Sequence, residues 1–354
     1  MTNPRELIET YGAWVDHGMQ KWFLDHPRAV PAYPMAEYHL GWRDQALVPS
    51  KAAQGKMLRP VLSLLSYKIF REDLERIIPL AAAIEFYHNH TLVFDDMQDG
   101  DRFRRNRPTV WSLWGIGQGI NVGLILGYLS EEFFLDLLNH DFPQEKLVSL
   151  TRAMIDTKLE VAEGQSLDLD FETKSSVNPS EYLNMIGKKT GALISLCTYG
   201  GSLLAQDNPV VAEKFKDFGR RLGIAMQIRD DLVGIWGGKE QSGKERAKDL
   251  RRRKKTFPIF NALQHLKGKD LERLQDYLRS SEEPKEETIA QIITSLEQSG
   301  IRAECEKSAN QLMDEVFATL HQIGISQAKL GPLETFSRHA FDSIGTLRQV
   351  ASPA

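Results

Sequence analysis

Three carboxylates stand close together in the segment Asp95 to Asp99 (DDMQD), at the end of a long apolar stretch. If that stretch is a helix, Asp95 and Asp99 share a face, because residues four apart lie one above the other. Asp96 is turned about 100° around the axis. A bound cation would offset the repulsion and the cost of burying these charges. Oxygen ligands favour Mg²⁺, which takes a few carboxylates together with waters and substrate phosphates. An acidic helix end in solvent is the alternative.

A second acidic pair, Asp230-Asp231, follows another apolar helical stretch. Gln227 and Asp231 are four residues apart and share a helical face, with Asp230 beside them. The pair could hold a cation as the first cluster could. A solvated helix end is again the alternative.

Basic residues accompany both acidic segments. Directly after the first come Arg102, Arg104, Arg105 and Arg107. Arginine suits planar, bidentate recognition of phosphate, so this segment predicts anion receptors beside a metal site. A solvated charged loop that neutralises the aspartates is the alternative.

A basic run from Lys248 to Lys255 follows the second pair, after Gly243-Lys244. A nucleic-acid patch is disfavoured because the net charge of the chain is −4 and no aromatic residues interleave with the basic ones. We expect a mobile basic lid over phosphates, with Gly237, Gly238 and Gly243 as hinges.

Further polar candidates lie upstream and between the clusters. Lys56 and Arg59 are three apart at a predicted helix start and share a face, although an ordinary basic helix start would look the same. His88 lies two helical turns before Asp95 on one face, where a buried core histidine is the alternative. Lys188-Lys189-Thr190-Gly191 could add a phosphate contact.

The elements that must position these residues read as helices throughout. Apolar residues recur at helical spacing, prolines precede several of the runs, and no alternating strand pattern bounded by turns is found. We therefore expect a single all-α domain over residues 1–354, with many antiparallel helices. Residues 28–50 read as a connector, and helices are predicted at about 5–25, 59–70, 80–99, 147–169, 181–204, 211–236, 257–279, 286–299 and 302–323.

Residues 108–130 carry no charge but include polar residues and five glycines. The stretch is long enough to span a bilayer but too weakly apolar for a helix facing lipid, so we expect a buried helix. The first residues lack an apolar signal core. The chain has only two cysteines among 354 residues, Cys197 and Cys305, which favours a reducing compartment such as the cytoplasm.

The order of these motifs resembles that of the trans-isoprenyl diphosphate synthases, or polyprenyl synthetases. The resemblance covers residues from about 55 to 258, over half of the chain. Each motif is weak alone, but their shared order is specific. The matching segments are Gly55 to Pro60, His88, Asp95 to Asp99, Arg104-Arg105, Pro108-Thr109, Gly164-Gln165, Asp168-Leu169, Lys189 to Gly191, Gln227, Asp230-Asp231 and Gly243-Lys244.

The resemblance implies a helical bundle around a central apolar cavity, and roles for the matching residues. It implies two or three Mg²⁺ ions held on an allylic diphosphate by Asp95, Asp99 and Asp230, with Asp96 and Asp231 as secondary catalytic carboxylates. It places the allylic substrate against Arg104, Lys189, Thr190, Gln227, Lys244 and Lys254. It places isopentenyl diphosphate against Lys56, Arg59, His88 and Arg105.

The implied reaction breaks the allylic carbon–oxygen bond first and then joins the cation to the double bond of isopentenyl diphosphate. It needs no protein nucleophile, in keeping with a sequence that shows no obvious catalytic triad. The family is usually homodimeric, so we expect a homodimer without nucleic-acid or stable membrane partners. A class I terpene cyclase would not need the basic isopentenyl diphosphate site, and a catalytically silent partner subunit is the non-enzymatic alternative.

Several positions depart from the family pattern. Gly234 stands where many relatives have a third Asp, so one second-site carboxylate is absent. Gln54 and Asn106 each replace a common Gly, Phe94 replaces a frequent His, and Arg253 replaces a Gly in the basic lid. These departures leave the reaction class in place and make the substrate choice less determined.

Product length should depend on Thr91 and His90, four and five residues before Asp95. In the family a large ring there stops the growing tail early. Because His90 is smaller than Phe or Tyr, we expect geranylgeranyl diphosphate, with farnesyl diphosphate as the next choice.

Overall fold

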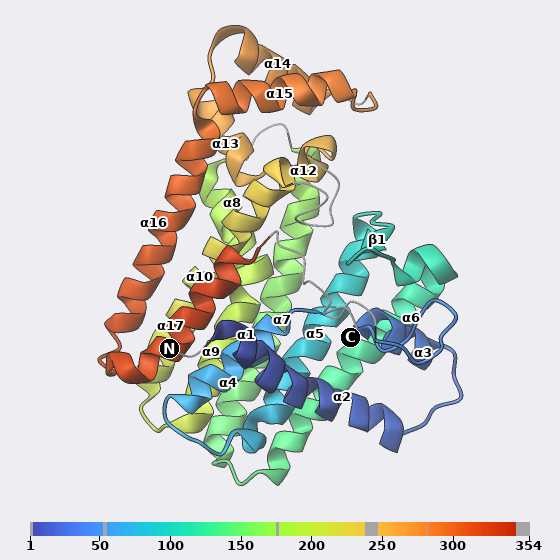
Figure 1. Cartoon of the computed structure of the whole chain (residues 1–354), viewed down its shortest axis with the longest axis vertical. Coiled ribbons are helices and arrows are strands. Elements are labelled where there is room, and N and C mark those ends of the chain that lie inside the picture. Colours follow the sequence, from blue (N-terminus) through green and yellow to red (C-terminus); the bar gives the residue numbers. More distant parts are fainter. Residues whose placement is uncertain (1–2, 52–54, 175–176, 238–246, 281, 345–354) are drawn as a thin grey trace.

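The computed structural model describes residues 3–51, 55–174, 177–237, 247–280 and 282–344. Helices dominate this part of the chain, as predicted (Figure 1). The first half contains α1 (Pro4–Leu7), η1 (Ile8–Gly12), α2 (Ala13–Asp25), α3 (Ala32–Leu40), α4 (Leu58–Lys68), η2 (Leu74–Ile77), α5 (Ile78–Gln98), β1 (Phe103–Arg104), β2 (Arg107–Pro108), α6 (Val110–Asp136), η3 (Leu137–Asn139) and α7 (Gln144–Thr173).

The second half is helical throughout its described residues. It contains α8 (Pro179–Ile186), η4 (Gly187–Gly191), α9 (Ala192–Ala205), α10 (Pro209–Trp236), α12 (Lys248–Arg251), α13 (Phe257–His265), α14 (Gly268–Arg279), α15 (Glu286–Gln298), α16 (Ile301–His321) and α17 (Gln327–Asp342).

Local signals begin several helices where the breakers predicted. Asn178 and Glu181 form a reciprocal capping box at the start of α8, and Pro179 occupies the first helical position. At the start of α10 the Asn208 side chain accepts a hydrogen bond from the Val210 amide at 3.0 Å. These caps satisfy amides that have no partner within the helix.

Long helices pack side by side around a contiguous apolar core. α5 lies along α6, and α9 packs against both α4 and α10. The 14 residues of α9 are all buried, since other helices surround it. α14 and α15 project at one end of the molecule, above α16 (Figure 1).

The structure corrects three predictions of helix position. The expected connector contains α3, which begins after Pro31, a residue compatible with a helix start. The predicted helix 257–279 is divided at Gly268, whose φ is 57°. The predicted helices end at residue 323 and so do not include α17, which contains Pro332; burial of side chains such as Phe336 stabilises the helix around this proline.

The predicted buried helix at 108–130 is α6, and the expectation of burial is wrong. α6 packs against α5 and α3, and only 28% of its most apolar window is buried. Among the described residues, Val110–Asn139 is the one helical stretch long and apolar enough to cross a membrane. Several of its large apolar side chains remain exposed, among them Ile116 and Tyr128.

Candidate active site

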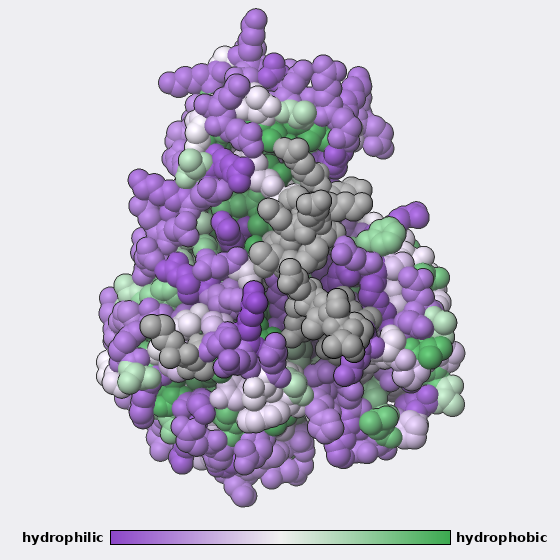
Figure 2. Space-filling view, in the orientation of Figure 1, coloured by the Kyte–Doolittle hydropathy of each residue, from purple (hydrophilic) through white to green (hydrophobic). Residues whose placement is uncertain are grey.

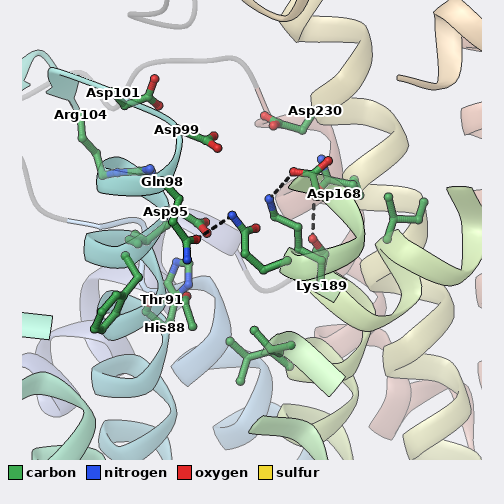
Figure 3. Close-up of a pocket in the computed structure, with 18 of the residues that line it drawn as sticks. His88, Thr91, Asp95, Gln98, Asp99, Asp101, Arg104, Asp168, Lys189 and Asp230 are labelled. Carbon is green, nitrogen blue, oxygen red and sulfur yellow. Dashed lines mark hydrogen bonds and ion pairs between the residues drawn. The ribbon is translucent and has the colours of Figure 1, made fainter. Parts of the chain in front are cut away.

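A cavity of about 1880 Å³ lies between α5 on one side and α7, η4 and α10 on the other. Its walls bring together side chains far apart in the sequence (Figure 3). Of the predicted site residues, those that line the cavity are Lys56, Arg59, His88, His90, Thr91, Asp95, Asp99, Arg104, Arg105, Lys189, Thr190, Gln227, Asp230, Asp231 and Lys254. Lys244 lies outside the described residues, as do the hinge candidates Gly238 and Gly243.

The first acidic segment ends α5, and two of its carboxylates face the cavity. Asp95 and Asp99 share one face of the helix, and Asp230 lies across from them on α10 (Figure 3). Burial raises the pKa of Asp95. Burial also acts to raise the pKa of Asp99, but Lys254 and Arg252 lower it to about 2. Asp99 therefore carries a full negative charge at neutral pH.

Asp96 has a different position from its neighbours. It is buried, does not line the large cavity, and accepts a hydrogen bond from Nε of Arg104 at 2.7 Å. Burial raises its pKa to about 6. The side chain therefore holds Arg104 from behind the cavity wall, and a secondary catalytic role for Asp96 would act through that arginine.

Asp231 lines the cavity, but hydrogen bonds to neighbouring elements occupy both of its carboxylate oxygens. One carboxylate oxygen accepts hydrogen bonds from the Tyr182 hydroxyl at 2.5 Å and from the Phe257 amide at 3.0 Å. The other accepts from Gln227, which itself accepts from the Thr190 hydroxyl at 2.7 Å. Burial, and then the charge of Asp249, raises the pKa of Asp231 to about 7.

Lys189 is held by a residue to which the sequence analysis gave no role. Its ammonium donates to Asp168 at 2.7 Å, and Lys254 lies 3.5 Å from the same oxygen. Gly164 makes the position of Lys189 possible, because a Cβ at 164 would lie 2.3 Å from the Lys189 backbone nitrogen. The motif Gly164-Gln165 with Asp168 was visible in the sequence, and its structural reason is this close approach of α7 and η4.

A second basic group lies deeper, around His88. Nη1 of Arg59 is 2.9 Å from Nε2 of His88. Since a guanidinium cannot accept, the histidine nitrogen accepts. Burial, followed by the charge of Arg59, lowers the pKa of His88 well below its usual value, which leaves the ring neutral. Glu85 is buried close to Arg105, and the sequence analysis did not identify it.

Arg104 and Arg105 are presented by the hairpin of β1 and β2. Arg105 and Asn106 form its turn with φ values of 53° and 60°. Two successive positive φ values are typical of the tight turns that prefer Asn and Gly, so Asn106 can replace the common Gly. Burial lowers the pKa of Arg105 to about 10.

Residues 248–254 cover the first acidic segment. Lys248 contacts Asp101 at 2.5 Å, and Arg252 donates to Asp99 at 3.0 Å. Arg253, whose φ is 53°, turns away and donates to the Tyr277 carbonyl oxygen at 2.9 Å. The sequence predicted a basic cover here without identifying Lys248 or Arg252 as the residues that contact carboxylates.

The oxygen ligands fit a hard divalent cation. Oδ1 of Asp99 is buried and has no hydrogen-bond partner among the described residues. Within the same residues, no three His, Cys, Asp or Glu side chains converge closely enough to hold an ion alone. This arrangement fits Mg²⁺, which takes few carboxylates and completes its shell with water and substrate phosphate.

Below the carboxylates the cavity is lined partly by apolar side chains, among them Val161, Met185 and Leu193. His90 lies at the contact of α5 and α6, where Nδ1 is 2.7 Å from the Gly123 carbonyl oxygen. The cavity thus combines a charged mouth with an apolar interior.

Comparison with known proteins agrees with this geometry. Residues 42–296 match the family model described as polyprenyl synthetase. The chain is 33% identical over 312 residues to a (2E,6E)-farnesyl diphosphate synthase of Mycobacterium tuberculosis, covering 87% of this chain and 85% of that protein. It is 38% identical over 240 residues to a geranylgeranyl pyrophosphate synthase of Geoglobus acetivorans, covering 68% and 73%.

Solved structures give the same result. The crystal structure of a polyprenyl synthetase from Streptomyces coelicolor A3(2) matches with a TM-score of 0.82 and 30% identity, covering 95% of this chain and 97% of that one. A geranylgeranyl pyrophosphate synthetase from Pyrococcus horikoshii matches with a TM-score of 0.81 and 28% identity, covering 96% and 98%.

Proposed function

The chain belongs to the polyprenyl synthetase family and is a prenyltransferase, and on that premise we propose that it condenses isopentenyl diphosphate with an allylic diphosphate to give a short-chain prenyl diphosphate. One observation carries the proposal. Asp95 and Asp99 face Asp230 across a single cavity whose interior is apolar. Two charged walls can hold a diphosphate, while the apolar interior accommodates its hydrocarbon tail.

Each of the two substrates would bind to one of the two clusters of basic side chains. We place the allylic diphosphate between the acidic walls, with Lys189 and Lys254 as donors to its oxygens. We place isopentenyl diphosphate against Lys56, Arg59 and Arg105. The two arginine guanidinium groups can bind phosphate bidentately, and the Lys56 ammonium can add a charged hydrogen bond. Neutral His88 accepts from Arg59 and so fixes the direction of that guanidinium.

The acidic residues would hold two or three Mg²⁺ ions, with Asp95 and Asp99 on one wall and Asp230 on the other. Bound Mg²⁺ would neutralise the diphosphate oxygens and favour departure of the leaving group. Asp168 keeps Lys189 charged and oriented, since its charge acts to raise the pKa of Lys189 against the effect of burial. Asp96 does the same for Arg104, through the hydrogen bond to Nε.

The reaction then follows from charge and exclusion of water. The allylic carbon–oxygen bond breaks and its electron pair leaves with the diphosphate, where the basic side chains stabilise the developing charge. The double bond of isopentenyl diphosphate attacks the allylic cation and forms the new carbon–carbon bond. A proton is then lost to the departing diphosphate. The apolar lining keeps water from the cation.

Product length is proposed from the floor of the cavity. Thr91 and His90 line it one helical turn before Asp95, and Tyr87 lies a further turn below. The moderate size of His90 favours a twenty-carbon product, with fifteen carbons as the next choice. Relatives named for each product have similar identity to this chain, so identity does not decide between them.

We propose that the chain forms a homodimer through α6. On α6 the side chains of Ile116, Ile120, Leu124 and Tyr128 are spaced four apart and are 41% to 70% exposed. Figure 2 shows apolar residues at the right-hand edge of a mainly hydrophilic face, where α6 lies in Figure 1. A regular apolar stripe on a long helix is typical of a surface that another molecule covers, and a second copy would bury both stripes.

We further propose that residues 1–354 form one synthase domain located in the cytoplasm. The matched structures extend over nearly the whole chain. Cys197 and Cys305 are buried, unpaired thiols, which suits a reducing compartment.

The proposed activity is tested by incubating the purified chain with Mg²⁺, isopentenyl diphosphate and a series of allylic primers. Elongated prenyl diphosphates, identified by chromatography after dephosphorylation, would support the synthase. Release of a cyclic hydrocarbon from the allylic primer alone would indicate a terpene cyclase, and absence of any product would indicate a silent subunit.

A further inference from the structure

The two acidic segments differ one helical turn after their first carboxylate. Asp99 follows Asp95 by four residues, whereas Gly234 follows Asp230 by the same interval. The face of α10 that carries Asp230 therefore offers no second carboxylate of its own at this height.

The structure places another carboxylate in the space that a side chain at 234 would occupy. A Cβ built on Gly234 would lie 1.8 Å from Oδ2 and 2.6 Å from Cγ of Asp249. Asp249 lies on the short helix α12 (Lys248–Arg251) and lines the active-site cavity together with Asp230 and Asp231. Only glycine at 234 allows this approach, because any other residue would overlap the carboxylate.

We propose that Asp249 supplies the third carboxylate of the second acidic cluster and helps to hold the metal-bound diphosphate. This inference rests on the proposed function. The carboxylate comes from the segment that covers the cavity instead of from α10, and Gly234 is the residue that makes room for it.

The segment 248–254, which covers the cavity, presents positive side chains to the first acidic cluster and the negative Asp249 side chain to the second. Lys248 and Arg252, on either side of it, pair with Asp101 and Asp99 of the first cluster. Asp249 lies against α10, which carries the second cluster. The same short segment therefore reaches both acidic walls, and its placement sets the charge balance on each.

The inference is tested with Mn²⁺ and inorganic pyrophosphate as probes, by measuring free Mn²⁺ with electron paramagnetic resonance during titration of the full chain. Asp249→Asn keeps the shape and removes the charge, and should weaken Mn²⁺ binding in the presence of pyrophosphate about tenfold. Asp217→Asn is the matched control, because Asp217 is on α10 but pairs with Arg221 at the surface. The control should bind like the wild type.

A carboxylate introduced at position 234 of α10 should restore Mn²⁺ binding when Asp249 has been removed. In Gly234→Asp/Asp249→Ala the remaining Cβ at 249 lies 3.3 Å from a Cβ at 234, so the new aspartate fits with a small adjustment. We expect Mn²⁺ affinity within about threefold of the wild type. Gly234→Ala alone should weaken binding as Asp249→Asn does, because its methyl group displaces the Asp249 carboxylate.

Unchanged Mn²⁺ binding in folded Asp249→Asn would overturn the inference while leaving the proposed function intact, provided that the wild type forms prenyl diphosphates. A purely structural role for Asp249 would lower the melting temperature and leave Mn²⁺ affinity unchanged. Failure of the wild type both to bind Mn²⁺ with pyrophosphate and to form product would reject the proposed function itself.

Discussion

Arg252 donates a hydrogen bond to Asp99 across 3.0 Å, although the two residues are 153 positions apart in the sequence. Lys254 lies 3.2 Å from the same carboxylate oxygen. Two cations of the protein therefore neutralise a carboxylate that is proposed to bind Mg²⁺. Both act on Oδ2, so Oδ1 remains without a partner among the described residues, and their positive charges oppose the binding of a metal ion beside them.

This repulsion predicts that Arg252→Ala increases the affinity for divalent metal. A charge-assisted hydrogen bond is lost, and its loss from the metal-free state should strengthen Mn²⁺ binding roughly tenfold, equivalent to about 1.4 kcal/mol. Titration of the variant with Mn²⁺ in the absence of substrate would measure the change. Arg221→Ala, which removes an exposed i,i+4 pair, is the control and should leave affinity unchanged. Weaker Mn²⁺ binding in Arg252→Ala would contradict the repulsion.

Gly164→Ala should displace Lys189 while leaving the lysine side chain itself unchanged. The added methyl would meet backbone atoms of Lys189 at 2.3 and 2.7 Å, and backbone cannot move aside as a flexible side chain can. We expect a loss of about 1 to 3 kcal/mol in the free energy of unfolding, together with a raised KM for the allylic substrate. Chemical denaturation and steady-state kinetics would measure the two effects.

Gly18→Ala is the control for this substitution. Gly18 is inside α2, and a Cβ there makes only an ordinary contact, at 3.5 Å from Ile78. The stability of this variant should be unchanged or slightly increased, because alanine favours helix more than glycine does. If Gly164→Ala were as stable and active as Gly18→Ala, the proposed reason for glycine at 164 would be wrong.

The sequence predicted the fold class and the facing acidic segments well, for a physical reason. Asp95 and Asp99 share a helical face by spacing alone, and the apolar stretch before them predicts the buried helix α5. The burial of Asp96 also follows from its rotation around the axis. Its contact with Arg104 was not predictable, because it depends on the hairpin that returns the arginine to α5.

Features that depend on tertiary packing could not be predicted from the sequence. The apolar composition of α6 indicates a helix but does not show that only one face meets the rest of the chain. The sequence shows only that Gly234 lacks a carboxylate, whereas the structure shows the side chain of Asp249 in that space. Contacts between residues far apart in the sequence, such as Arg252 with Asp99, leave no periodic pattern from which they could be predicted.

The apolar stripe on α6 predicts the oligomeric state and its response to charge. Ile120→Glu would place a carboxylate in the proposed interface of both copies, where burial without a partner is costly. We expect the dissociation constant of the homodimer to rise roughly a hundredfold, measured by light scattering coupled to size-exclusion chromatography over a concentration series.

Val210→Glu is the control for the interface, because Val210 is exposed at the start of α10, away from the stripe. That variant should remain dimeric. If the wild-type chain is monomeric at all concentrations, the proposed dimer is wrong. If Ile120→Glu is still dimeric, the interface must lie on another surface.

His90 and Gly127 together predict how product length can be shifted in both directions. A Cβ on Gly127 would lie 2.9 Å from Nδ1 of His90, whose ring is held at the α5–α6 contact by the Gly123 carbonyl oxygen at 2.7 Å. Gly127→Ala should push the ring toward the cavity and shorten the main product by one five-carbon unit. His90→Ala should lengthen it, because the ring no longer limits the tail. Chromatography of the dephosphorylated prenols would resolve both changes.

The double variant identifies the group that transmits the effect of residue 127. If Gly127→Ala acts by displacing the imidazole, it has nothing to displace in the His90→Ala background. His90→Ala/Gly127→Ala should then give the same long product as His90→Ala alone, so that the two effects are not additive. A product shortened by Gly127→Ala in both backgrounds would show that the methyl group narrows the cavity by moving α6 against α5. His90 would in that case no longer account for the floor of the cavity.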